Sequence, residues 1–144
     1  MIRKIAALAA VAVLVVACGG ATTTQKPEES EAPAASEAAP AGARVVDLEI
    51  AAGAITPASV SVKKGETITF NAKNVSAEEV ELIVGLKPDV DGDSGDSLKE
   101  AEEIAPGATK SVTYTFDGDG PYAFGDQIGD HYSKGAKGDI VFTP

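Results

Sequence analysis

The sequence has very few cysteine, histidine and methionine residues, which small domains use for disulfides, soft metal sites and nucleophilic catalysis. Its 144 residues include one cysteine, one histidine, one methionine and no tryptophan. A single cysteine excludes a disulfide within one molecule. With one histidine and one cysteine, neither a Ser/His/Asp nor a Cys/His arrangement has independent support, so we expect a protein that is not an enzyme.

Basic side chains are also scarce. From Arg44 to Pro144 the chain carries 18 acidic and 9 basic side chains, a net charge of −9. Such a domain is repelled by nucleic acid and by anionic lipid surfaces. We therefore expect no nucleic-acid partner.

Aromatic residues are few and confined to the C-terminal half of the chain. Because large aromatic side chains dominate a packed core, the folded unit must lie there. We expect one domain over residues 44–144, about 100 residues, which is long enough to bury a core. The seven aromatic residues are Phe70, Tyr114, Phe116, Tyr122, Phe124, Tyr132 and Phe142.

Residues 1–17 have the character of a signal peptide. Arg3 and Lys4 form a basic start, and the apolar run that follows to Ala17 is shorter than the roughly 20 residues that span a bilayer. The run ends in a stretch that resembles a bacterial lipobox, Leu14-Val15-Val16-Ala17-Cys18-Gly19. The resemblance implies lipid attachment at Cys18 and a protein held on the membrane outside the cytoplasm, in the periplasm or on the outer surface.

Residues 18–43 differ in composition from both flanks. They are rich in Ala, Pro, Glu and Thr and contain no aromatic residue, Ile, Leu or Val. Such a composition cannot offset the entropy of ordering. We expect a disordered tether that spaces the domain from the membrane.

The remaining chain alternates apolar and polar residues in short runs, which predicts β-strands. Seven or eight such runs, separated by turn signals, are typical of a β-sandwich. One short segment, Leu98 to Ile104, has a helix-like spacing instead. The runs are centred on Val46–Ile50, Val60–Val62, Ile68–Ala72, Val80–Val84, Val112–Phe116, Tyr122–Phe124 and Asp139–Thr143.

The order of several short motifs in this domain resembles the cupredoxin family, the blue-copper fold. The resemblance covers nearly all of residues 45–144 and implies an all-β Greek-key sandwich. The motifs are Ile55-Thr56-Pro57 with Ser59, Val60, Val62, Lys64 and Gly65; Asn74; Ala105-Pro106-Gly107; Tyr122-x-Phe124; and Gly129-Asp130-His131-Tyr132 with Gly135 and Gly138.

The same resemblance implies that the type 1 copper site is lost. The family's histidine, cysteine, histidine and methionine ligands fall on Val80, Asp126, His131 and Ala136, so a single ligand remains. Blue copper depends on a soft thiolate, which this domain does not contain. We expect no cofactor, with copper or calcium as the alternative.

Two weaker metal sites stay open. Asp126 and His131 lie five residues apart and could hold zinc or copper(II), although Lys134 and Lys137 nearby oppose a cation. The alternative is that His131 is a hydrogen-bonded loop residue beside Tyr132.

The acidic segment from Asp89 to Glu100 has the spacing of an EF-hand calcium loop. Asp89, Asp91, Asp93 and Glu100 occupy ligand positions, but Ser94 stands where that loop needs glycine. The alternative is a solvated acidic hairpin.

The glutamates of a third acidic group, Glu78, Glu79 and Glu81, are expected at solvated edges, since neighbours on a strand point to opposite faces.

Together these expectations describe a lipid-anchored binding or accessory module of the cell envelope with an unidentified protein partner. The alternative is a metal-binding or copper-dependent electron-transfer protein.

Overall fold

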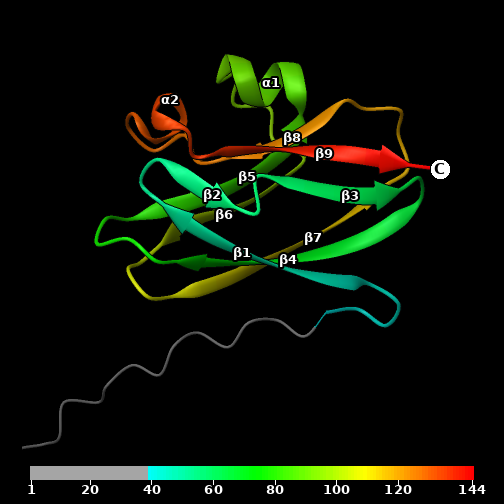
Figure 1. The fold of residues 1–144 in the computed structure, drawn as a ribbon, viewed down its shortest axis with the longest axis horizontal. Helices are drawn as coiled ribbons and strands as arrows, with labels where there is room; N and C mark the ends of the chain where they lie inside the picture. The colour runs from blue at the N-terminus through cyan, green and yellow to red at the C-terminus, as the bar shows by residue number, and fades with distance from the viewer. Residues whose placement is uncertain (1–38) are drawn as a thin grey trace, which may run out of the picture. The chain divides into compact units, whose positions relative to one another are not determined.

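The computed structural model describes residues 39–144, which form a sandwich of two β-sheets (Figure 1). The predicted signal segment, Cys18 and most of the predicted tether lie outside the described residues. The first sheet has the order β2 (Ala54–Thr56), β1 (Arg44–Ala51), β4 (Glu66–Asn74) and β7 (Thr109–Phe116). The second has the order β3 (Ser59–Lys63), β9 (Lys137–Thr143), β8 (Tyr122–Gly125), β5 (Val80–Leu86) and β6 (Lys99–Ile104).

Each sheet contains one parallel pair of strands. β1 lies parallel to β4, with Leu48 opposite Ala72, and β3 lies parallel to β9, with Val62 opposite Phe142. The other pairs are antiparallel. The prediction of an all-β sandwich is therefore confirmed.

The core lies between the sheets and consists of the inward side chains of the alternating runs. Phe70 on β4 is fully buried, and its ring centroid lies 6.2 Å from the rings of both Phe116 and Phe124. The Phe70–Phe116 pair is edge-on, with an interplanar angle of 89°, and such packing adds to the free energy gained from burying the rings. All of the strand runs predicted from alternation contribute buried residues to this core.

The prediction of a helix-like segment over Leu98–Ile104 is wrong, because residues 99–104 form the edge strand β6. Ala101 and Ile104 are both buried, and their spacing of three suggests a helix turn. The strand accommodates this spacing because Glu103 has a φ of 50° and the register with β5 shifts between Val80 and Leu82. Such a bulge turns the next side chain inward.

Two short helices lie on the loops of the second sheet. α1 (Lys87–Gly92) begins with a proline in its first turn, where proline needs no hydrogen-bond partner, and ends at Asp93 in a left-handed conformation. α2 (His131–Lys134) is a single turn that ends at Gly135. No helix in residues 39–144 is long and apolar enough to cross a membrane.

The strand registers define two ends of the sandwich. We call the first end the entry pole, because the chain enters β1 there at Arg44. The same end contains the 64–65 turn, the 117–121 loop and Thr143. At the other, which we call the imidazole pole, β4 ends at Asn74, β5 begins and β8 ends. The C-terminus and α2 accordingly lie at opposite ends in Figure 1.

Close packing of Gly138 against the core gives a test of this arrangement. A Cβ at this buried position would clash with the Phe124 ring and lie 2.8 Å from the Ala58 carbonyl oxygen. We expect Gly138→Ala to lower the free energy of unfolding by about 1–3 kcal/mol in urea titrations, because backbone cannot move aside cheaply. At Gly92 a Cβ meets nothing within 4 Å. Gly92→Ala should change stability by no more than about 0.5 kcal/mol, and equal stability of both variants would contradict the packing.

Candidate functional site

The four positions on which the resemblance predicts the copper ligands to fall are all buried at the imidazole pole. Val80 begins β5, Asp126 follows β8, His131 begins α2, and Ala136 precedes β9. The loop from β8 to β9 folds back on itself: the Asp126 N–H donates to the Ala136 carbonyl and the Ala136 N–H donates to the His131 carbonyl, each at 3.0 Å. Val80 and Ala136 belong to the hydrophobic core.

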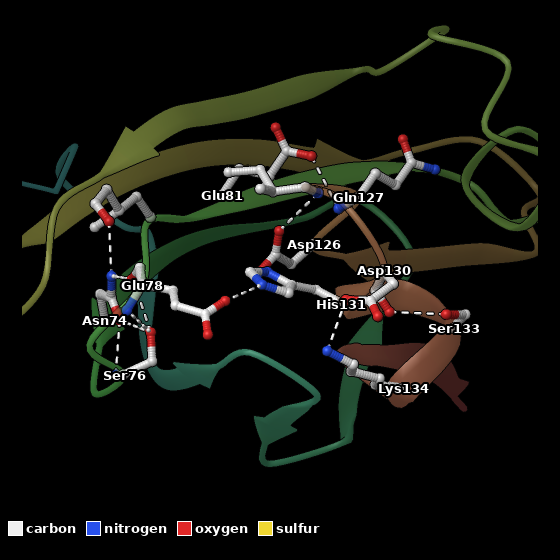
Figure 2. Close-up of polar contacts among 12 residues, drawn as sticks. Asn74, Ser76, Glu78, Glu81, Asp126, Gln127, Asp130, His131, Ser133 and Lys134 are labelled. Atoms are coloured by element: carbon white, nitrogen blue, oxygen red, sulfur yellow. Dashed lines mark hydrogen bonds and ion pairs between the residues drawn. The ribbon is translucent and has the colours of Figure 1, made fainter.

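Asp126 and His131 are joined by a direct hydrogen bond, as Figure 2 shows. Nδ1 of His131 lies 2.8 Å from Oδ2 of Asp126. Asp126 is fully buried and His131 is 3% exposed. The other carboxylate oxygen of Asp126 accepts the N–H of Ile128 at 3.1 Å. Both oxygens of the buried carboxylate are therefore satisfied, as a buried charge requires.

Glu78 is the third residue of this hydrogen-bonded group, and the sequence analysis did not predict its contact with His131. Its Oε2 lies 3.1 Å from Nε2 of His131, although the Glu78 side chain is 69% exposed. We predicted a solvated edge for Glu78, and the exposed carboxylate does reach solvent, but it also covers the imidazole. The available signal was its position, two residues before Val80, where the family places its first histidine.

Two carboxylates on one imidazole favour the protonated ring. A neutral imidazole has one N–H donor, whereas an imidazolium donates from both nitrogens. Burial, the largest single influence, lowers the pKa of His131, but the hydrogen bonds to Asp126 and Glu78 outweigh it and raise the pKa above its usual value. The imidazolium form, with one N–H for each carboxylate, therefore persists to higher pH than in a free histidine.

Asn74 fixes the loop that carries Glu78. The Asn74 side chain is fully buried, and its Nδ2 donates to the carbonyl oxygens of Glu78 and Ile104, each at 2.7 Å. Its Oδ1 accepts from the backbone N–H and the hydroxyl of Ser76, each at 2.8 Å. This clip ties the 75–79 loop to the end of β6 and places the backbone of Glu78 beside His131 (Figure 2).

Glu81 anchors the loop between β8 and α2 from the outer face of β5. Its Oε1 accepts the N–H of Gln127 at 2.9 Å, and the Gln127 side chain donates to the Val90 carbonyl at 2.7 Å. Burial raises the pKa of Glu81, the Gln127 N–H lowers it, and the charge of Asp126 raises it further, with a net increase. Glu81 is therefore half-buried and structural, which corrects the expectation of a solvated edge.

Tyr132 connects the site to α1. Its ring lies against Gly125, where a Cβ would come within 2.5 Å of the ring, and its hydroxyl donates to Oδ1 of Asp91. Burial and this hydrogen bond both raise the pKa of Tyr132. The ammonium of Lys137 lies 4.9 Å from the ring centroid, a cation–π contact.

The arrangement around His131 is poorly suited to a metal ion. The two carboxylates bind opposite nitrogens of the ring, so they do not converge on one point with it. Metals bind neutral imidazole, and an imidazolium has no free electron pair. Within residues 39–144 no three His, Cys, Asp or Glu side chains are grouped as metal ligands.

The structure does not bring the four predicted calcium ligands together. Asp91 faces Tyr132 and Lys87 from α1, while Asp89 and Glu100 line a separate hollow of about 30 Å³ with Asp96. Asp93 ends the helix in an exposed position. The calcium site stays a prediction, without support from this geometry.

Comparison with solved structures supports the same fold. The auracyanin of Roseiflexus castenholzii is 23% identical, with a TM-score of 0.59, covering 72% of this chain and all of its own. Auracyanin A of Chloroflexus aurantiacus, a blue copper protein, is 20% identical, with a TM-score of 0.59, covering 71% and 100%. A multicopper oxidase is 13% identical, with a TM-score of 0.54, covering 69% of this chain and 38% of its own.

These likenesses define a blue-copper type of sandwich, and a family model agrees. The model of the cupredoxin-like domain matches residues 8–141, and the chain belongs to that family. The match begins inside the predicted signal segment, so it does not mark where the domain starts. No curated protein sequence matches the chain significantly.

The protonated imidazole can be tested directly, since His131 is the only histidine. We expect its NMR titration midpoint to lie above about 6.5, and Glu78→Gln to lower it. Because the folded pKa is raised, the stability from this group is fully present below the unfolded value and is lost as pH rises through the folded value. Glu79→Gln, an exposed neighbour without a bond to the ring, is the matched control. A midpoint at or below the ordinary value would refute the imidazolium.

Proposed function

We propose that this protein is a non-enzymatic binding or accessory module, anchored by lipid on the outer side of the cytoplasmic membrane or at the cell surface, and that it works without a type 1 copper ion. The observation that carries the proposal is the 2.8 Å hydrogen bond between Asp126 and His131. It joins the position that matches the family's cysteine to the only matching ligand that remains.

The chemistry of the four positions supports the absence of blue copper. A valine and an alanine offer no donor at the two outer positions, and a carboxylate replaces the thiolate whose covalent bond defines the blue-copper centre. The Asp126 carboxylate already receives two hydrogen bonds. A copper ion would have to displace the proton of His131 and break its bond to Asp126.

The non-enzymatic part of the proposal rests on the same group. Both nitrogens of the one histidine are engaged by carboxylates, so the ring has no free position to take a proton from a hydroxyl or thiol. Its contact with solvent passes through Glu78, which leaves Asp126 and most of His131 sealed from a substrate.

A second candidate is a low-affinity zinc or copper(II) site. The observation in its favour is that Glu78 is exposed beside Nε2 of a buried imidazole. A metal entering from solvent would meet one nitrogen and one carboxylate oxygen after the ring loses its proton. This site would bind the metal more tightly as pH rises and His131 loses its proton. That pH dependence distinguishes it from a surface cluster of carboxylates.

Copper addition with a gain-of-function variant tests the ligand positions. We expect no absorption at about 600 nm when copper is added to the native domain, residues 44–144, because that part of the sequence has no cysteine. We expect the combined Val80→His, Asp126→Cys and Ala136→Met variant to turn blue. The same variant with Asp126→Ser in place of Asp126→Cys is the control and should stay colourless. A blue native protein would overturn the proposal, and a colourless triple variant that still folds would overturn the assignment of positions.

Lipid attachment has its own test. Cells expressing the full chain should yield a membrane-bound form whose N-terminus begins at an acylated Cys18, identified by mass spectrometry. Cys18→Ser should release the protein from the membrane fraction, because the polypeptide would lose its acyl chains. Membrane retention of Cys18→Ser would contradict a lipid anchor at this residue.

A further inference from the structure

The chain enters the domain at the end farthest from His131. Arg44 begins β1 beside Ile68 on β4, and the parallel strands run together to Ile50 and Asn74. Asn74 in turn binds the loop of Glu78. The entry pole and the imidazole pole are therefore separated by the full length of β1 and β4 (Figure 1).

The two poles also differ in how their charges are balanced. At the entry pole Arg44 pairs with Glu66 at 2.6 Å, and Lys64 pairs with Asp119 at 2.5 Å. These exposed pairs leave little net charge at that end.

At the imidazole pole carboxylates are in excess. Within residues 39–144, Glu79 and Glu103 form no ion pair and are exposed, and Glu78 pairs only with His131. Three lysines lie at this end: Lys73 is exposed, Lys110 donates to the Glu102 carbonyl at 2.6 Å, and Lys134 pairs with Asp130 at 2.7 Å. They are outnumbered by the carboxylates, because Glu49, Glu102 and Asp130 add to the three glutamates already named.

We infer that the anchored domain is held with its entry pole toward the lipid and its imidazole pole away from it. The inference rests on the proposed lipid attachment at Cys18. It adds that the residues around Glu78 and His131 are presented to molecules that arrive from the aqueous phase, and not to the membrane surface.

Two forces act in the same direction. The tether expected from composition has 20 residues between Cys18 and Ala39, and a random coil of that length spans roughly 25 Å. Such a tether would keep the entry pole nearer the lipid than the imidazole pole. An anionic lipid surface also repels carboxylates within a Debye length of about 8 Å. The exposed Glu100 and Glu102 on β6 make a sideways approach unfavourable as well.

Energy transfer to labelled lipid measures this orientation in the intact lipoprotein. Because the sulfur of Cys18 carries the lipid, an introduced cysteine is the only free thiol. Asp117→Cys at the entry pole and Glu79→Cys at the imidazole pole, both exposed, would each carry the same fluorescent donor. The proteins are placed in phosphatidylcholine vesicles with acceptor-labelled lipid, with and without phosphatidylglycerol.

We expect higher transfer efficiency from position 117 than from position 79, and a larger difference when phosphatidylglycerol is present and salt is low. Equal or reversed efficiencies would overturn the inference. The labelled variants should melt at the same temperature as the native protein, and Cys18→Ser forms set the background. If the native protein fails to float with vesicles, the lipid anchor itself is wrong; if it floats but the efficiencies are equal, only the orientation is wrong.

Discussion

The hydrogen bond between Asp126 and His131 is the constraint on which the imidazole pole depends. Both side chains are removed from water, and a buried ion pair is tolerated only when each partner is fully hydrogen-bonded. Ile128 and Glu78 supply the remaining bonds, and no buried side-chain polar atom in residues 39–144 lacks a partner. Removing either member would leave the other charge buried and unpaired, which costs more than the pair itself contributes.

The surrounding loops are arranged to keep this pair in place. Asn74 holds the loop of Glu78 on one side, and Glu81 holds the N–H of Gln127 on the other. Gly125 lets the Tyr132 ring lie directly on β8, and the hydroxyl of that ring binds Asp91 on α1. Three loops distant in the sequence are thus joined by hydrogen bonds from side chains to backbone and, between Tyr132 and Asp91, from side chain to side chain.

Alternation along the strands was sufficient to predict the sandwich, because each buried face repeats every second residue. It failed at β6, where the bulge at Glu103 moves Ile104 inward and imitates a helical spacing. The meeting of Asp126 with His131 followed from their place on one loop. The role of Glu78 did not, because an exposed glutamate near two others has no local signature. Its partner comes from 53 residues further along the chain.

Hydrogen bonding at this pole explains how the fold accommodates a carboxylate at Asp126 beside apolar side chains at Val80 and Ala136. An imidazolium has two N–H donors, and the carboxylates of Asp126 and Glu78 lie where each accepts from one of them. The raised pKa of His131 favours this protonated form, whose charge offsets that of the buried carboxylate. Under the proposed function, the site therefore keeps a hydrogen-bonded imidazole but has no thiolate through which a blue-copper ion could exchange an electron. The part of this group that reaches solvent is Glu78, on the loop that Asn74 ties to β6.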